Sequence, residues 1–239
     1  MLLRDTWAWL TDPASWEGPN GLLELTLEHL AVAALSTAIA VVVALPGALW
    51  LGHRHRGKFL VAAFVNVGRA VPSFGIIVVA AVLFIRAGLP ADFWPLVIAL
   101  VLLALPPIFT SAHTAVGEVD PALVEAARGM GLGGGQVLRR VELPLALPLV
   151  MNGIRIAFAQ VIATVALGAV VSSGGGLGQP IIVGFATLRT GGDVLLLGGA
   201  ILVALLTLVA DRLFALLQRL ATPAGVRRLS TPRVDRRAA

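Results

Sequence analysis

Long apolar runs separated by short polar stretches dominate this sequence. A helix that crosses the roughly 30 Å hydrocarbon core of a bilayer needs about 20 mostly apolar residues. Five runs meet that requirement, at about 30–51, 59–85, 93–117, 144–171 and 194–217. The pattern therefore predicts an all-α polytopic membrane protein with about five transmembrane helices.

The composition agrees with a chain embedded in a membrane. Of its 239 residues, 58% are hydrophobic and only 13% are charged, and the mean hydropathy is +0.92. Typical soluble domains carry roughly 25% charged residues, so this chain has too few polar side chains to cover a soluble surface. It contains no cysteine, which excludes a disulfide framework and a cysteine-based metal or redox site.

Lysine and arginine residues are distributed unevenly between the two sides that these runs define. One side holds twelve of them: Arg54, Arg56, Lys58, Arg128, Arg139, Arg140, Arg219, Arg227, Arg228, Arg233, Arg236 and Arg237. The other side holds Arg4, Arg86 and Arg189. Because lysine and arginine concentrate in cytoplasmic loops, we expect the N-terminus outside and the C-terminus in the cytoplasm. The net charge of +5 then reflects orientation in the bilayer rather than binding to nucleic acid.

This orientation divides the chain into three parts. Residues 1–29 form an external segment, residues 30–220 a transmembrane domain, and residues 221–239 a basic cytoplasmic tail. A polar, glycine-rich loop at 118–144 interrupts the apolar pattern on the cytoplasmic side. We call residues 118–144 the coupling loop, for reasons given below.

The coupling loop carries clear helix start and stop signals. Asp120 followed by Pro121 is typical of a helix start. Gly131 is typical of a helix end in the left-handed conformation. We therefore expect a short helix over residues 121–130. Pro144 is expected to end the segment that follows that helix and to start the fourth span.

The same loop resembles the EAA loop of ABC importer permeases, at which the membrane subunit grips its ATPase. That loop has the pattern E-A-A, three residues, G, nine residues, I-x-L-P. The positions that fall on it are Glu125, Ala126, Ala127, Gly131, Leu143 and Pro144. Val141 replaces the usual isoleucine. The resemblance implies that these six residues couple the chain to an ATPase and that the chain has the type I ABC importer permease fold.

Other motifs are similar to permeases of the glycine betaine, carnitine and choline type. They are V-P-S at 71–73, V-D-P-A-L-V-E-A-A-R-G-M-G-L at 119–132, V-E-L-P-L-A-L-P at 141–148, G-I-R at 153–155, G-G-L-G at 175–178 and a late Asp211. The resemblance implies a permease for a small zwitterionic osmoprotectant in the cell's inner or plasma membrane. Its expected partners are two ATPase subunits, a separate extracytoplasmic binding protein, a second permease copy or paralogue, and membrane lipid.

Several alternatives were weighed against this interpretation. A permease for another small solute, such as an amino acid, shares the EAA loop and remains open. An intramembrane enzyme would need a His/Glu metal set or a Ser/His/Asp trio, and the apolar runs contain neither. A free-standing channel would need a filter-like repeat. We expect no catalytic residue, no metal and no cofactor, and the glycine-rich stretch at 174–178 is not a P-loop because no Lys-Ser/Thr follows it.

Polar residues within the second run are candidates for the translocation path, because polar groups inside a bilayer are costly. Arg69 lies roughly 15 Å into this run at about 1.5 Å per residue. Asn66 and Ser73 lie three and four residues away on either side, so the three can share a face, and Pro72 exposes a backbone carbonyl nearby. We expect a cation at position 69 to favour a solute with a carboxylate. The alternative is that Arg69 pairs with carbonyls at a subunit interface, or snorkels.

Other polar groups receive structural predictions. Arg155 is expected to be structural, and Asp211 and Arg212 to lie at the membrane interface. His53 and His55 occupy a basic loop without a nearby carboxylate, which predicts solvated side chains.

The predicted outer side carries two further features. The residues Trp7, Trp9, Trp16 and Trp94 are typical of an aromatic anchor belt, and an aromatic cage for a quaternary ammonium group is the alternative. The glycine-rich loop at 172–193 is a candidate contact for a binding protein.

Overall fold

The computed structural model describes residues 1–70, 72–171 and 175–221, without the side chains at 65, 67–70 and 221. Within these ranges the regular structure is entirely helical, which confirms the predicted fold class. In chain order the elements are α1 (Leu2–Thr11), α2 (Pro13–Trp16), α3 (Leu22–His53), α4 (Lys58–Ala70), α5 (Ser73–Arg86), α6 (Trp94–Gly117), α7 (Pro121–Gly129), α8 (Gly134–Val137), the π-helical segment Leu138–Glu142, α9 (Leu143–Gly168), α10 (Gly178–Ala186), the 3₁₀ turn Leu188–Thr190 and α11 (Asp193–Ala221).

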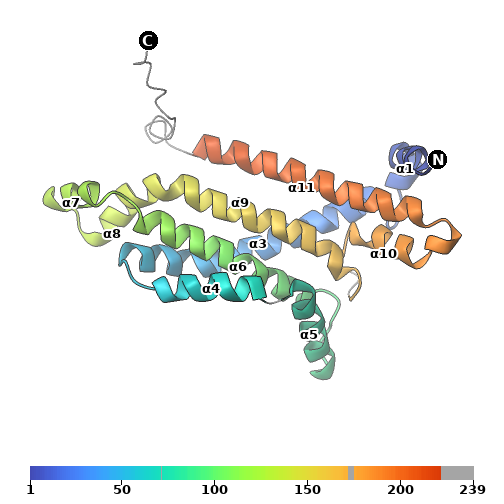
Figure 1. Cartoon of the computed structure of the whole chain (residues 1–239), viewed down its shortest axis with the longest axis horizontal. Helices are drawn as coiled ribbons and strands as arrows, with labels where there is room; N and C mark the ends of the chain where they lie inside the picture. Colours follow the sequence, from blue (N-terminus) through green and yellow to red (C-terminus); the bar gives the residue numbers. More distant parts are fainter. Residues whose placement is uncertain (71, 172–174, 222–239) are drawn as a thin grey trace, which may run out of the picture.

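Four long helices form the body of the molecule. Helices α3, α6, α9 and α11 run side by side along its longest axis (Figure 1). Helix α6 packs against both α3 and α9, and α11 packs against α9. In the part of the chain that the structure describes, these four segments are the ones long and apolar enough to cross a membrane.

Small residues let α3 and α6 approach closely. From Ser36 onwards along α3, small buried residues recur every four positions, at Ser36, Ala40, Ala44, Ala48 and Gly52. At the last of these, a Cβ would lie only 2.7 Å from the carbonyl oxygen of His113 on α6. Lipid tails are as apolar as leucine, so helix association in a membrane depends on such close packing rather than on the hydrophobic effect.

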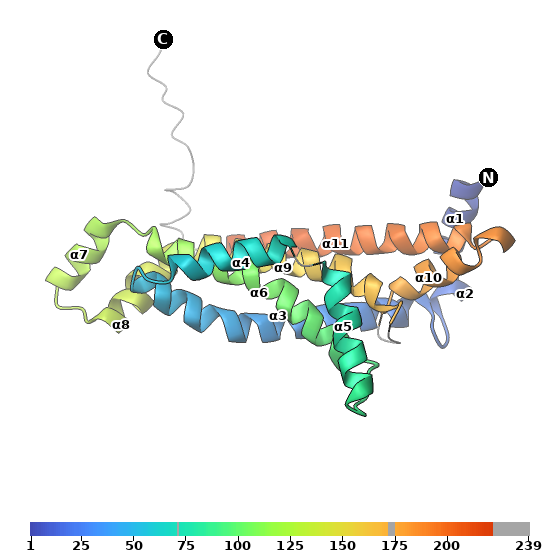
Figure 2. The same cartoon turned by 60° about the horizontal axis from the view of Figure 1, so that its bottom comes forward.

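The second predicted span is two helices instead of one. Helix α4 lies along the bundle, whereas α5 projects away from it (Figure 2). Pro72 immediately precedes α5, and a proline favours a break because it lacks an N–H and clashes with the carbonyl four residues before it. Asn66 and Arg69 therefore belong to α4, whereas Ser73 begins α5, so the three do not lie on one continuous helix.

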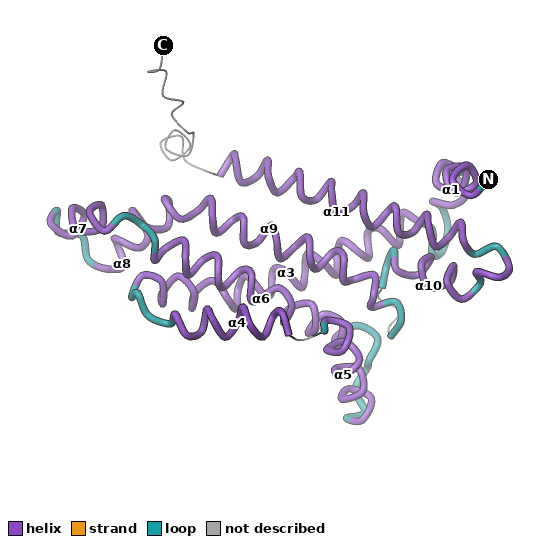
Figure 3. The backbone as a smooth tube through the Cα atoms, in the orientation of Figure 1, coloured by secondary structure: helices purple, strands orange, loops and turns teal. Residues whose placement is uncertain are grey.

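The coupling loop and the N-terminal helices lie at opposite ends of the bundle. Figure 3 shows α7 and α8 at one end and α1 and α10 at the other. Helix α11 starts near α1 and ends towards the α7 end (Figure 1). The predicted glycine-rich loop at 172–193 is more ordered than expected, since it contains α10 and a 3₁₀ turn; residues 172–174 lie outside the described residues.

Pro144 lies in the first turn of α9, where the sequence predicts the fourth span to start, but the helical segment before it does not end there. Helix α8, the π-helical segment and α9 form one continuous helical stretch, Gly134–Gly168. The N–H of Leu143 donates to the carbonyl of Leu138, five residues back. This wide turn accommodates the proline, whose missing N–H would leave a gap in a regular α-helical ladder.

Candidate functional site

The coupling loop begins with a capped helix, as predicted. The Asp120 carboxylate accepts a hydrogen bond of 2.9 Å from the backbone N–H of Ala122, and Pro121 occupies the first turn of α7. The helix ends at Gly129, and Gly131 adopts the left-handed conformation with φ of +86°. Side chains other than glycine are strained there, so Gly131 fixes the point at which the chain turns back.

Helix α7 has one face inside the loop and one outside. Val124 and Ala127 are buried in a small apolar cluster with Val119 and Val137. Glu125 and Ala126 are exposed. Of the two alanines in the coupling motif, Ala126 therefore faces outward, whereas Ala127 packs inside the loop and holds it together.

Two exposed apolar residues that the sequence prediction did not include lie on α7 and directly after its end. The side chains of Leu123 and Met130 are 48% and 76% exposed. Together with Ala126 they follow the spacing i, i+3, i+7, which places all three on one side of a helix. That periodicity was the signal available in the sequence. An exposed apolar ridge on a short, rigid helix is suited to docking into a groove of another protein.

The return segment of the loop is polar and positively charged. The Gly133 N–H donates to the side-chain oxygen of Gln136 at 3.0 Å. The exposed side chains of Arg139 and Arg140 line an open hollow with Gln136 and the neighbouring glycines. The remaining two predicted coupling residues, Leu143 and Pro144, are half-buried where this segment joins α9.

A hydrogen-bonded pair closes the base of the coupling loop. The Nδ1 atom of His53, the last residue of α3, lies 2.6 Å from Oε2 of Glu142 in the π-helical segment. The two side chains are only 12% and 2% exposed. The prediction of a solvated His53 is therefore wrong, because its carboxylate partner lies far away in sequence. His55 is exposed as expected.

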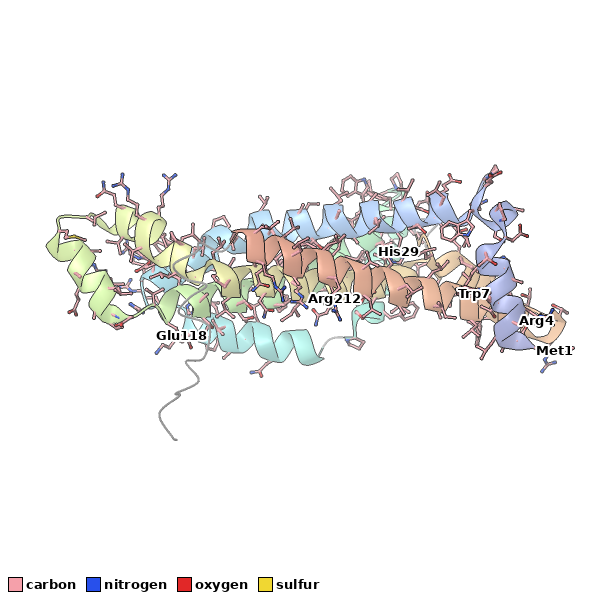
Figure 4. The ribbon with its side chains drawn as sticks, turned by 90° about the horizontal axis from the view of Figure 1, so that it is seen from above. Met1, Arg4, Trp7, His29, Glu118 and Arg212 are labelled. Atoms are coloured by element: carbon pink, nitrogen blue, oxygen red, sulfur yellow. The ribbon has the colours of Figure 1, made fainter. Side chains whose placement is uncertain are left out.

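The same end of α3 is also fixed to α6. The His113 side chain on α6 bonds through Nε2 to the carbonyl oxygen of Arg56, at 2.6 Å, in the turn between α3 and α4. Glu118 follows α6 and lies at the coupling-loop end of the bundle (Figure 4). His113, Glu118 and Lys58 line a pocket at this junction.

The structure does not test the four residues expected on the translocation path. Asn66 and Pro72 are exposed and Ser73 is half-buried. The side chain of Arg69 lies outside the described residues. Their assignment to a path therefore remains a prediction.

A charged pair that sequence analysis did not connect joins α9 to α11. Arg155 donates from Nε and from a terminal nitrogen to the two carboxylate oxygens of Asp211, at 2.5 and 2.6 Å. The side chains are 29% and 28% exposed. Asp211 is therefore a partner of Arg155, whereas Arg212, predicted with it at the interface, is exposed on α11 (Figure 4).

Two further features concern the other end of the molecule. His29 is fully buried between α3 and α9, and its Nε2 lies 2.9 Å from the carbonyl oxygen of Ile162. The tryptophans do not share one environment. Trp9 packs on Gly198 of α11, and Trp16 donates to the Leu10 carbonyl at 2.8 Å, whereas Trp7 and Trp94 are exposed.

Comparison with known proteins gives a consistent result. The model of the family described as "Binding-protein-dependent transport system inner membrane component" matches residues 36–222. The chain is 34% identical to the osmoprotectant import permease protein OsmW of Salmonella typhimurium, over 93% of this chain and 100% of that protein. It is 31% identical to the glycine betaine/carnitine/choline transport system permease protein OpuCB of Bacillus subtilis, over 86% of this chain and 90% of that protein.

A solved structure supports the same assignment. The chain resembles a chain of the MetNI methionine ABC transporter, solved in inward-facing conformations, with a TM-score of 0.71 and 25% identity. The match covers 84% of this chain and 96% of the other.

Proposed function

The chain belongs to the binding-protein-dependent inner membrane components, the permease subunits of ABC importers, and we propose that its solute is a small zwitterionic osmoprotectant. Such permeases are not enzymes, since ATP hydrolysis belongs to a separate subunit and a binding protein supplies the solute. The observation that carries the solute proposal is the similarity, over most of the chain, to relatives named for osmoprotectants, glycine betaine, carnitine and choline. The amino-acid alternative is less favoured, because the methionine transporter is similar at 25% identity only.

The proposed assembly contains two ATPase subunits and a second permease copy or paralogue. In it, the N-terminus faces outside, and the coupling loop and C-terminal tail face the cytoplasm. The exposed ridge of Leu123, Ala126 and Met130 would dock into the ATPase, with Glu125 beside it. Support comes from the position of α7 at the end of the bundle, beyond the four long helices (Figure 1).

The coupling role predicts a specific loss in two variants. Gly131→Trp forces a bulky side chain onto a left-handed residue, and Glu125→Lys reverses an exposed charge on α7. We expect both variants to insert into the membrane but to abolish stimulation of ATP hydrolysis by the binding protein. The measurement is ATPase activity of the complete importer in liposomes, with and without loaded binding protein.

Matched substitutions separate coupling from general damage. Gly129 has open space and an ordinary helical backbone, so Gly129→Ala should keep stimulation while Gly131→Ala reduces it. Glu118→Lys reverses another exposed charge at the edge of the loop and should also keep it. Full stimulation in both Gly131→Trp and Glu125→Lys would remove the coupling role from this loop.

The solute proposal predicts an order of competition. A cation at position 69 near the path attracts a carboxylate and repels a bare cation, so glycine betaine and carnitine should displace labelled glycine betaine better than choline does. Arg69→Gln should reduce the difference in competing strength between glycine betaine and choline. Arg86→Gln, at the C-terminal end of α5, should leave that difference unchanged. Choline that outcompetes glycine betaine would refute the role of the acid group, and preferential uptake of methionine would refute the solute class.

A further inference from the structure

The end of α3 is held between the coupling loop and α6. The coupling loop is joined through the backbone to α6, which precedes it, and to α9, which follows it. Helix α3 has no such connection to the loop. Its contact with the base of the loop is the bond of 2.6 Å between His53 and Glu142, from which water is nearly excluded.

Two features of the loop hold the His53 ring in place for this bond. The π-helical segment inserts a wide turn at Leu138–Glu142, which changes the direction of Glu142 relative to a regular helix and turns it towards His53. A Cβ at Gly134 would lie 3.3 Å from Nε2 of His53, so the start of α8 closely approaches the other side of the imidazole. The ring is thus held between Glu142 and the backbone of α8.

Contacts on the other side of α3 prevent its end from moving independently of α6. Gly52 packs directly against the His113 carbonyl of α6, and the His113 ring bonds to the Arg56 carbonyl in the next turn. The His113 ring also stacks on Phe109, which contacts Phe64 of α4. A displacement of Glu142 would therefore be passed to α3 and, through the turn after it, to α4.

We propose that His53 and Glu142 form a strut that transmits movement of the coupling loop to α3, and thereby to α4 and the broken second span. The strut rests on the proposed coupling role of the loop and extends it to a helix outside the loop. His53 and Glu142 are positioning residues, since the strut acts through other groups and contacts no solute. The expected consequence of losing it is ATP hydrolysis that continues without full transport.

Single substitutions test the strut in the complete importer in liposomes. We expect His53→Ala and Glu142→Ala to keep the ATPase bound and hydrolysing ATP, while the solute transported per ATP falls by about fivefold or more. Glu142→Gln keeps an acceptor oxygen and should retain most of the coupling. Exposed neighbours provide the controls: His55→Ala and Glu118→Ala should leave the ratio unchanged. An unchanged ratio in both strut variants, or loss of ATPase binding in both, would overturn the proposal.

A reversible cross-link distinguishes loss of the strut from misfolding of the variants. The chain has no cysteine, so His53→Cys with Glu142→Cys introduces a unique pair for a short bis-methanethiosulfonate reagent. A strut moves as one unit, so the cross-linked double variant should recover coupling, and reduction of the cross-link should abolish it again. The cysteine-free permease treated in the same way reports any effect on the partner subunits. Cross-linked protein that transports no better than reduced protein would contradict the proposal.

The result distinguishes the strut from the proposed function. If Gly131→Trp abolishes stimulation and the strut variants stay coupled, the coupling loop stands and the strut is wrong. If Gly131→Trp and Glu125→Lys both stay fully stimulated, the coupling role itself fails.

Discussion

Arg155 and Asp211 form a pair of opposite charges between α9 and α11, with side chains 29% and 28% exposed. Arg155 lies about 20 Å along the helical stretch from Glu142, at about 1.5 Å per residue, well inside the predicted fourth span at 144–171. An isolated charge at that depth is costly, and the two-pronged bond to Asp211 compensates it. The pair also ties α11 to the rest of the bundle, beside the bond from Gln218 to the Pro148 carbonyl.

Removing one partner of this pair should destabilise the protein more than removing both. Asp211→Leu alone or Arg155→Met alone leaves an uncompensated charge among apolar helices. We expect each to lower the melting temperature of the purified protein by several degrees, and the double variant to recover most of the loss. Arg212→Met, at the exposed neighbouring position, is the control and should change little. Additive effects of the two substitutions would show that the pair contributes no interaction energy.

Long-range partners are the part of the site that the sequence could not provide. Asp120, Pro121 and Gly131 act within a few residues of themselves, so their roles followed from local rules. The partners of His53 and Asp211 lie 89 and 56 residues away. No spacing rule connects residues at such distances, and each was assigned to solvent or to the interface for want of a visible partner.

At the scale of elements, the packing of α9 depends on Gly153, which has no side chain. A Cβ there would lie 2.4 Å from Cβ of Ser111 and 2.9 Å from the carbonyl oxygen of Pro107. The backbone of α9 thus packs directly on α6, next to the proline pair 106–107. This contact holds together the two helices that carry the coupling loop.

Gly153→Ala should therefore destabilise the bundle. We expect a loss of about 1–3 kcal/mol from overpacking, visible as a lower melting temperature and weaker resistance to proteolysis. Gly47→Ala on α3, where a Cβ meets nothing within 4 Å, should be neutral or slightly stabilising. Equal behaviour of the two variants would mean that α9 moves away from α6 without cost.

Hydropathy predicted the long helices well but not the division of the second span. The apolar run at 59–85 is continuous in composition, and Pro72 was recognised within it as an interruption. Prolines 106 and 107 lie inside α6 without breaking it, whereas Pro72 stands between α4 and α5. Composition alone does not distinguish a proline that is accommodated from one that ends a helix, because the outcome depends on whether neighbouring groups satisfy the freed carbonyl.

For the whole molecule, the uneven distribution of lysine and arginine predicts an orientation that the structure leaves untested. Single cysteines introduced at Glu17 and at Arg128, both exposed, report the two ends of the bundle. In intact cells a membrane-impermeant maleimide should label Glu17→Cys and should label Arg128→Cys only after permeabilisation. The cysteine-free parent chain supplies the background. The reverse pattern would place the coupling loop outside and refute docking to a cytoplasmic ATPase.

The separation of Arg155 and Asp211 along the chain has a consequence for biosynthesis. Asp211 is synthesised 56 residues after Arg155, which is about 3–11 s later at roughly 5–20 residues per second. During this interval the nascent fourth span carries a cation without its counter-ion. The insertion machinery must therefore keep the fourth span away from lipid, or only partly inserted, until the span that carries Asp211 has been synthesised.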